Sequence, residues 1–408
     1  MSKNQINKRE QLEMLTIDQL VPQDHLVRKL EAAIDFSFIY PLVENLYSSL
    51  GRPSIDPVVL FKMTFIQYVF GIRSMRQTIK EIETNMAYRW FLGFGFHTEV
   101  PHFSTFGKNY ARRFQDTNVF EQIFYRILKE IMNRGLLHAD HVFIDSTHVK
   151  ASANKRKYDK KVVRKETRAY EEKLQLELNI DREENGKKPF PPEKFEKDEW
   201  KEIKESTTDP ESGYYVKDER TKQFAYSFHA ATDEKGFVLG TIVTPGNVHD
   251  SYVLQPLVEK IIEKVKKPLA IAADAAYKTP AITNFLLENQ MLPVLPYTRP
   301  KTKDGFFRKH EYVYDEYYNC YLCPQGQVLK YTTTTKEGYR QYKSNPTICA
   351  NCPLLSQCTE SRNHQKLIQR HIWETYMEEA EHLRHSYDIK QIYAKRKDTI
   401  ERVFEDAE

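Results

Sequence analysis

Two short apolar segments, each followed by an aspartate, constrain the fold of this 408-residue chain more than any other feature. Residues 141–145 read HVFID and residues 268–274 read PLAIAAD, and both are patterns of buried β-strands. If the two strands are neighbours in one sheet, Asp145 and Asp274 emerge together at one edge, where open α/β sheets place their sites. A strand-ending aspartate is often only a turn former, so the pair carries more weight than either residue alone.

The segments around these strands predict a mixed α/β order. Residues 224–232 and 236–244 are rich in β-forming residues, and the intervening Asp233-Glu-Lys predicts a hairpin. The other expected elements are helices at 250–265 and about 280–289, a strand at 292–297, and helices from about residue 370. This order suits a sheet whose first three strands are antiparallel and whose fourth pairs parallel with the first. That is the ribonuclease-H arrangement, which we expect for a catalytic domain over residues 138–408.

Residues 1–137 have helical patterns throughout and predict an all-α N-terminal domain. Residues 57–71 begin with proline, end at glycine and are apolar on most sides, which indicates a buried central helix. Ser74 and Ser104 begin two further helices. The last of these carries three cations: Lys108, Arg112 and Arg113. A helix, a short connection and a basic helix would suit a DNA reader, although purely structural helices have the same spacing.

A charged insertion is expected at about residues 155–222 and is interpreted as helical. Residues 150–170 contain nine Lys or Arg against two acids, whereas residues 171–219 contain sixteen acids against nine bases. This asymmetry indicates a basic face for a polyanion beside an acidic segment, and a solvated charged helix is the alternative. The candidate DNA contacts here are Lys155, Arg156, Lys157 and Arg164.

All five cysteines fall in a second insertion, at about residues 300–369. Their clustering points to a metal site rather than a disulfide framework. Two CxxC pairs suit the tetrahedral thiolate site of a structural, zinc-ribbon-like Zn²⁺, with a fifth cysteine beyond them. The candidate ligands are Cys320, Cys323, Cys349, Cys352 and Cys358. An iron–sulfur cluster is the second interpretation, because proline follows Cys323, and free thiols are the third.

A third acid lies on the expected final helix, over residues 393–404. Ile400, Val403 and Phe404 form its apolar face, and Glu401 lies beside that face, so it can point along the sheet edge toward the two aspartates. Hard carboxylate oxygens held close together bind Mg²⁺ or Mn²⁺. Two such ions can activate a water or a 3′-hydroxyl and stabilise the departing oxygen of a phosphodiester. The alternative is a solvent-facing glutamate paired with Lys397.

Several sequence motifs resemble those of DDE-type transposases of bacterial insertion sequences. DSTHVKASAN at 145–154, ADAAYK at 273–278 and TIERVF at 399–404 are similar to the family's first-Asp, second-Asp and glutamate motifs. GRPSIDP at 51–57, GIRSMRQ at 71–77, RWFLG at 89–93 and HFSTF at 102–106 resemble its N-terminal domain. The resemblance covers nearly the whole chain, in order. It implies a DNA-binding helical domain and a catalytic domain in which Asp145, Asp274 and Glu401 form the catalytic, metal-binding triad.

Two departures from the family pattern lie near the C-terminus. In many relatives a tyrosine and an arginine precede the glutamate by seven and four residues, whereas Tyr393 and Arg396 precede Glu401 by eight and five. Lys397 therefore occupies the arginine position and is a candidate DNA contact, but the sequence leaves open which basic residue contacts phosphate. Glu408 stands where relatives carry a basic residue. We therefore expect the chain to be truncated at its C-terminus.

The resulting functional prediction is a transposase that binds insertion-sequence ends, cleaves the phosphodiester with two metal ions and transfers the 3′-hydroxyl end to target DNA. The alternatives are a catalytically inactive, truncated remnant that only binds DNA, and a host nuclease of the same fold. We expect a dimer or larger assembly on DNA ends and a cytoplasmic, nucleoid-associated location. No membrane partner is expected, because no apolar run approaches the ~18 residues of a membrane span.

Two further polar residues receive structural interpretations. His229 lies within an expected strand and is interpreted as a core histidine with satisfied hydrogen bonds. Asp250 follows the third strand, and we interpret it as a helix cap rather than as part of the site.

Overall fold

The computed structural model describes residues 14–48, 54–164, 170–195, 200–299 and 302–407. The chain divides into two compact units, Met1–Leu136 and Leu137–Glu408. Within the described residues, no helix combines the length and the apolar character needed to cross a membrane.

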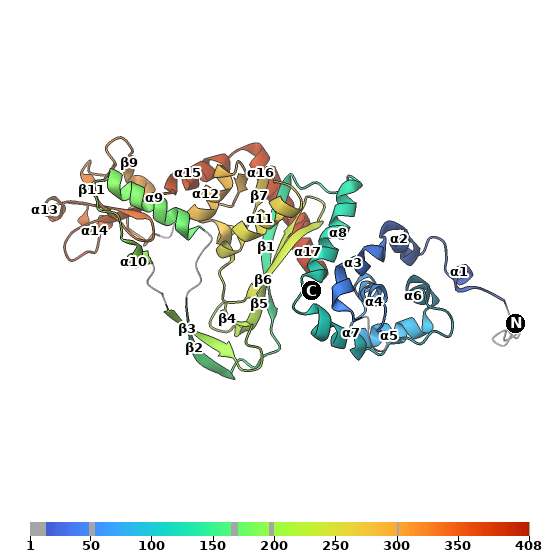
Figure 1. Cartoon of the computed structure of the whole chain (residues 1–408). Coiled ribbons are helices and arrows are strands. Elements are labelled where there is room, and N and C mark those ends of the chain that lie inside the picture. The colour runs from blue at the N-terminus through green and yellow to red at the C-terminus, as the bar shows by residue number, and fades with distance from the viewer. Residues whose placement is uncertain (1–13, 49–53, 165–169, 196–199, 300–301, 408) are drawn as a thin grey trace, which may run out of the picture. The chain divides into compact units, whose positions relative to one another are not determined.

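The first unit is helical, as the sequence predicted. Its α-helices are α1 (Ile17–Leu20), α2 (Leu26–Ala33), α3 (Ile39–Val43), α4 (Pro57–Val69), α5 (Met75–Thr84), α6 (Met86–Phe91), α7 (Ser104–Asn109) and α8 (Val119–Asn133) (Figure 1). A π-helical turn, Tyr110–Phe114, continues α7.

Helix α4 is the central helix of this unit. Asp56 caps its N-terminus, with the side chain accepting from the Val58 amide, and proline occupies the first turn. Leu60, Met63 and Ile66 on α4 are fully or almost fully buried. The buried helix predicted over residues 57–71 is confirmed as far as Ile66, whereas Tyr68 and Val69 at its C-terminal end are exposed. The predicted cap is confirmed too, because Ser74 accepts a hydrogen bond from the Gln77 amide at the start of α5.

The second unit is built on a mixed sheet of β1 (His141–Lys150), β4 (Gly213–Val216), β5 (Lys222–Thr232), β6 (Val238–Pro245), β7 (Ala270–Ala272) and β8 (Leu292–Val294). Strand β5 pairs antiparallel with β1 and with both β4 and β6. On its other side β1 pairs parallel with β7, and β7 pairs parallel with β8. The predicted pairing, three antiparallel strands and a fourth parallel to the first, is found.

Helices cover both faces of this sheet. On one face α11 (Leu254–Lys264) and α12 (Pro280–Glu288) bury a cluster that contains Val142, Ile144 and Ile271. On the other face α16 (Tyr387–Ala394) and α17 (Ile400–Ala407) pack on alternate residues of the same strands, among them Phe143 and Ala272. Successive side chains of a strand point to opposite faces of the sheet. The position of a residue along β1 or β7 therefore indicates which of the two helical layers its side chain faces.

The charged insertion is only partly helical, so the expectation of a helical insertion is wrong. It contains α9 (Glu171–Glu184) and the short α10 (Pro192–Phe195), but β2 (Tyr158–Arg164) and β3 (Trp200–Ser206) form a separate antiparallel pair. We call this pair the β2–β3 ribbon. The β-branched residues Val162, Val163 and Ile203 lie within the two strands, and their β preference accounts for the ribbon.

The cysteine-bearing insertion forms a second, five-stranded antiparallel sheet. Its strands are β9 (Val313–Asp315), β10 (Cys320–Leu322), β11 (Val328–Thr334), β12 (Tyr339–Lys343) and β13 (Leu367–His371), in the order β13-β12-β11-β10-β9. Two short helices, α13 (Pro346–Cys349) and α14 (Leu355–Cys358), lie between β12 and β13 in the chain. Helix α15 (Glu374–Leu383) follows the sheet.

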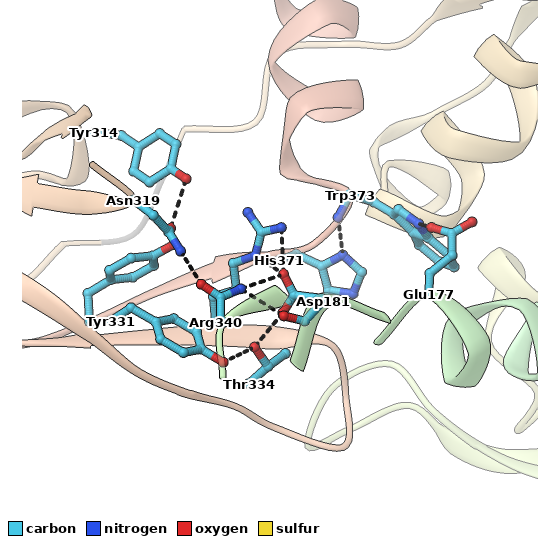
Figure 2. Close-up of polar contacts among 11 residues, drawn as sticks. Glu177, Asp181, Tyr314, Asn319, Tyr331, Thr334, Arg340, His371 and Trp373 are labelled. Carbon is cyan, nitrogen blue, oxygen red and sulfur yellow. Dashed lines mark hydrogen bonds and ion pairs between the residues drawn. The ribbon is translucent and has the colours of Figure 1, made fainter. Parts of the chain in front are cut away.

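A buried polar network fastens α9 to this second sheet (Figure 2). The Asp181 carboxylate accepts hydrogen bonds from Thr334 Oγ1 at 2.6 Å and from Arg340 Nε at 2.7 Å. One turn earlier, Glu177 accepts from the indole of Trp373 at 2.6 Å. One turn later, Asn185 accepts from Asn319 at 2.6 Å. Helix α9 of the charged insertion therefore packs on the sheet of the cysteine-bearing insertion, although the two are far apart in sequence.

The C-terminal segment is not the single helix expected over residues 393–404. Helix α16 ends at Ala394, a 3₁₀ turn spans Lys395–Asp398, and α17 begins at Ile400. The Thr399 hydroxyl donates to the Lys395 carbonyl at 2.9 Å. The backbone at Thr399 leaves the helical region. Because of this break, Arg396 and Lys397 do not have the positions relative to Glu401 that a continuous helix would give them.

Candidate active site

Asp145 and Asp274 occupy matching positions on two parallel neighbours. Phe143 on β1 pairs with Ala272 on β7, and each aspartate lies two residues beyond its member of that pair. Because the strands run in the same direction, equal offsets bring the two carboxylates to the same sheet edge. Asp145 lies on the same face of β1 as Phe143, which is the face covered by α16 and α17.

Each aspartate is also held by local backbone hydrogen bonds. The Asp145 carboxylate accepts from the Ser146 amide at 2.9 Å. The Asp274 carboxylate accepts from the Ala276 amide at 2.9 Å and so caps the 3₁₀ turn Ala275–Tyr277. Asp274 therefore has the turn-forming role that a strand-ending aspartate often has, as well as its place at the edge.

Glu401 reaches this edge from α17. The helix packs on the sheet through Ile400, which is fully buried, and Phe404, while Glu401 itself is exposed. The charge of Glu401 is close enough to act on Asp145, as is that of Asp274. Of the three acids that the sequence singled out, the two aspartates thus lie at one sheet edge, and the charge of Glu401 acts on Asp145 from α17.

Arg396, which the sequence did not assign to the site, contacts it directly. Its Nη2 donates to Asp145 Oδ2 at 2.6 Å, and both side chains are largely buried. Lys397, the residue in the family's arginine position, is exposed. The break at Thr399 explains the difference, because it displaces the residues before Glu401 from regular helical spacing. An arginine five residues from the glutamate was visible in the sequence, but the break was not.

Burial raises the pKa of Asp145 above its ordinary value. The positive charge of Arg396 and the hydrogen bond from Ser146 oppose this rise, and the negative charges of Asp274 and Glu401 add to it. Three neighbouring acids with one buried arginine form a strongly charged, asymmetric site. Perturbed carboxylates of this kind are characteristic of functional sites, although structural ion pairs perturb them too.

Two family models match the chain. A transposase domain (DUF772) matches residues 15–112, and a transposase DDE domain matches residues 322–408. The first match lies in the helical unit, and the second contains Glu401 and four of the five cysteines. The chain belongs to the DDE-type transposases of insertion sequences. The two aspartates lie outside both matched regions, so their role rests on the geometry above. No curated protein and no solved structure matched.

The carboxylates of the transposase are the ligand type that Mg²⁺ and Mn²⁺ prefer. Across the part of the chain that the structure describes, however, no group of three or more His, Cys, Asp or Glu side chains is arranged to hold a metal ion. At the triad the reason is visible, because Arg396 engages Asp145 and Glu401 is exposed to solvent. The donor chemistry fits a divalent ion, whereas this arrangement favours the guanidinium.

The same finding applies to the cysteines, all five of which are free thiols. Cys358 Sγ lies 3.2 Å from the Tyr312 hydroxyl, and Cys323 packs against the same aromatic cluster. Cys320 is buried on β10 next to Tyr321, which belongs to that cluster, so Cys320 faces the opposite side of the sheet. The structure therefore separates Cys320 from Cys323 and Cys358.

The candidate DNA-contacting residues fall into different environments. Lys108 and Arg112 are exposed, whereas Arg113 is engaged within its unit by Asn109, by Ser54 at 3.2 Å and by the Tyr47 ring. Lys155, Arg156 and Lys157 are exposed just before the β2–β3 ribbon. The side chain of Arg164 lies outside the described residues.

Within the ribbon the basic run is partly neutralised. Lys160 pairs with Glu202 at 2.9 Å and Lys161 with Glu205 at 2.8 Å. The acids of the neighbouring strand thus compete with any polyanion at these two positions. The exposed cations before the ribbon have a clearer path to a phosphate backbone than the paired lysines within it.

A second polar cluster, which the sequence did not connect to the triad, consists of His229, Thr244, Asp250 and Tyr277. His229 is fully buried and lies 3.2 Å from the Tyr277 hydroxyl and 3.3 Å from Thr244 Oγ1, which confirms the core histidine. Burial lowers the pKa of His229 to about 4. Asp250 is not the predicted cap, because His249 accepts the capping bond from the Ser251 amide. The Asp250 carboxylate lies 4.0 Å from His229 instead.

Proposed function

We propose that this chain is a transposase that binds insertion-sequence ends, cleaves their phosphodiester bonds with two metal ions and transfers the freed 3′-hydroxyl to target DNA. Its catalytic residues are Asp145, Asp274 and Glu401. The observation that carries the proposal is the equal offset of the two aspartates beyond a paired parallel register, with the charge of Glu401 acting on the first. The family matches support the same function.

The proposed catalytic core is ribonuclease-H-like. Its support is the strand order β6-β5-β1-β7-β8, with antiparallel pairs on one side of β1 and parallel pairs on the other. Helical layers on both faces complete the arrangement. In this proposal residues 138–408 form the catalytic domain, and α9 of the charged insertion packs against the sheet of the cysteine-bearing insertion.

At the triad, bound Mg²⁺ or Mn²⁺ would activate a hydroxyl nucleophile and stabilise the departing oxygen. The ligands would be the three carboxylates of the triad. The protein's own contribution is to hold Asp145 and Asp274 at fixed strand ends through the Ser146 and Ala276 amides. Preorganised groups of this kind lower the barrier because they need little rearrangement during the reaction.

DNA binding is proposed for the helical unit, residues 1–137, and for exposed cations elsewhere. Support comes from the exposure of Lys108, Arg112 and Lys397 and of the three cations before the ribbon, Lys155, Arg156 and Lys157. Arg113 is a weaker candidate, since its side chain is already used inside the unit. Assembly as a dimer or larger complex would occur on the DNA ends.

A structural Zn²⁺ is proposed for four of the cysteines: Cys323, Cys349, Cys352 and Cys358. Cys320 is the one left out, because it faces the other side of its strand and lies outside the matched DDE domain. Four thiolates can hold Zn²⁺ tetrahedrally, but the sulfurs would have to close around the ion, since no such group is assembled among the described residues.

The test is cleavage of the element's own terminal repeats, identified as inverted repeats in the DNA that flanks the gene. The wild-type chain should nick these ends in Mg²⁺, and the Asp274→Ala variant should lose cleavage by at least about 10³-fold while binding ends nearly as well. Loss of the metal-dependent chemistry removes most of the rate enhancement, whereas the carboxylate contributes nothing favourable to phosphate binding. Cleavage retained in Asp274→Ala would contradict the catalytic assignment.

A catalytically inactive DNA-binding protein is the second candidate. The observation that favours it is the engagement of Asp145 by Arg396 in place of a three-ligand site. The same assay separates the two candidates, because the inactive protein would bind the ends specifically but would not nick them in Mg²⁺ or Mn²⁺. Nicking of unrelated DNA at equal rates would instead indicate a general nuclease.

A further inference from the structure

The Arg396–Asp145 ion pair differs from a second buried arginine–aspartate pair of residues 137–408, Arg340–Asp181. Arg340 grips Asp181 through two nitrogens, Nε at 2.7 Å and Nη2 at 2.6 Å. Arg396 makes a single short contact with Asp145, and its Nη1 lies 3.5 Å from the Tyr393 hydroxyl. The Nε of Arg396 is buried and lacks a hydrogen-bond acceptor among the described residues.

This geometry leaves much of the guanidinium's bonding capacity unused. A guanidinium has five N–H donors in a planar fork, and a carboxylate can accept two of them at once. A buried polar atom without a partner costs free energy, so a purely structural arginine would be expected to satisfy more of its donors. Arg396 instead places a positive charge near three acids, and besides Asp145 only the Tyr393 side chain, among the described residues, is recorded as contacting it, through the hydroxyl at 3.5 Å and the ring at 5.7 Å.

We propose that Arg396 occupies the metal-binding side of Asp145, so that a divalent cation can bind the triad only when the Arg396–Asp145 ion pair opens. The inference rests on the proposed metal site. The guanidinium compensates the charge of Asp145 while the site is without metal, and it competes with the ion for the same carboxylate. Because only the open fraction of the chain can bind the ion, apparent metal affinity is reduced by that fraction.

The location of Arg396 makes such opening feasible without disturbing Glu401. Arg396 lies in the 3₁₀ turn Lys395–Asp398, and Glu401 lies beyond the break at Thr399, on α17. Ile400 and Phe404 anchor α17 on the sheet independently of that turn. The side chain of Arg396 can therefore leave Asp145 while the glutamate keeps its place.

The experiment is a titration of the full chain with MnCl₂ in the absence of DNA, followed by electron paramagnetic resonance of free Mn²⁺. Arg396→Gln should bind Mn²⁺ roughly ten- to a hundredfold more tightly than wild type, the factor that corresponds to one hydrogen bond between charged groups. Lys397→Gln is the matched control. It removes the same charge from the adjacent exposed position and should change affinity by less than about twofold, since exposed charges are screened.

The variant Arg396→Lys distinguishes the effect of the guanidinium contact with Asp145 from the effect of a positive charge near the site. It keeps the positive charge but loses the planar fork and part of the reach, so its affinity should lie between wild type and Arg396→Gln. Affinity in Arg396→Gln equal to or weaker than wild type would overturn the inference and leave the metal site standing. If wild type, Arg396→Gln and Asp274→Asn all bind Mn²⁺ equally weakly, the proposed metal site itself fails.

A second measurement follows the wild-type protein itself and uses a variant only for assignment. In wild-type protein labelled with ¹⁵N-arginine, the ion-paired guanidinium of Arg396 should give slowly rotating Nη resonances, assigned by their absence from Arg396→Lys. These resonances should disappear as Mg²⁺ is added. Their persistence at saturating Mg²⁺ would overturn the inference, because metal and ion pair would then coexist.

Discussion

Two buried arginine–aspartate pairs in the described part of the second unit differ in how completely their polar atoms are hydrogen-bonded. Asp181 and Arg340 sit in a network in which Thr334, Asn185 and Asn319 satisfy the neighbouring polar atoms (Figure 2). Asp145 and Arg396 sit at a sheet edge beside two further acids, with the arginine only partly satisfied. A buried ion pair whose polar atoms are all hydrogen-bonded is expected where the pair stabilises the fold. We expect an arginine with unused donors where, as proposed for Arg396, a metal ion must take its place.

The largest expected effect comes from breaking the complete network. Asp181→Ala leaves Arg340 without its buried partner and removes the acceptor of Thr334. We expect the free energy of unfolding of the second unit to fall by about 3–5 kcal/mol, the usual result of removing one member of a buried pair. Denaturant unfolding followed by circular dichroism measures this loss.

Asp145→Ala should cost clearly less in the same measurement, because it also relieves repulsion with Asp274 and Glu401. The double variant Asp181→Leu/Arg340→Met serves as the control. It replaces the pair by apolar side chains and should recover most of the lost stability. Equal losses from Asp181→Ala and Asp145→Ala would erase the distinction between the two pairs.

An intermediate effect is expected in the pH dependence of stability. The pKa of Asp145 is raised in the folded chain, chiefly by burial, so the folded state favours its protonated form. Its stabilising contribution is present below the unfolded pKa of about 3.9 and is lost as pH rises through the raised folded pKa. The stability of wild type relative to Asp145→Asn should therefore fall as pH rises through that window. If the difference in unfolding free energy between wild type and Asp145→Asn stays constant with pH, the pKa of Asp145 is not raised in the folded chain.

The smallest expected effect distinguishes the exposed cations from the paired lysines of the ribbon. Neutralising Lys155, Arg156 and Lys157 should weaken DNA binding and reduce the log–log salt slope by about 0.9 for each phosphate that the protein no longer neutralises. Lys160→Gln/Lys161→Gln should change the slope less, since Glu202 and Glu205 already pair with these residues. Filter binding between 50 and roughly 200 mM salt provides the slopes. If neutralising the exposed cations and neutralising the two ribbon lysines changed the salt slope equally per charge, pairing with Glu202 and Glu205 would not be what weakens the contribution of these lysines.

The features that the sequence predicted best are those with a local physical signal. The apolar runs ending at Asp145 and Asp274, the hairpin after Asp233 and the proline-started helix α4 each follow from periodicity or turn chemistry, and the structure contains all of them. The parallel pairing of β1 with β7 followed from the order of elements. Family resemblance supplied the proposed roles of the acids, which periodicity alone does not give.

The features that the sequence missed depend on long-range contacts. The break at Thr399, which exchanges Arg396 for Lys397 at Asp145, follows from packing of α16 and α17 on the sheet rather than from helix propensity. The β2–β3 ribbon was not predicted, because the many charged residues at 155–222 were interpreted as a charged helical insertion. Its β-branched residues did indicate strands. The contact of α9 with the second sheet joins residues about 150 positions apart, which no local pattern reveals.

We propose above that Asp145, Asp274 and Glu401 hold the divalent ions used in DNA cleavage. The most direct measurement is a crystal structure of the full chain with Mn²⁺, using anomalous scattering to locate the metal. We expect a peak between the carboxylates of Asp145 and Asp274, with the Arg396 guanidinium displaced from Asp145. Mn²⁺ bound elsewhere at saturating concentration, with the 2.6 Å contact from Arg396 to Asp145 unchanged, would contradict the proposal.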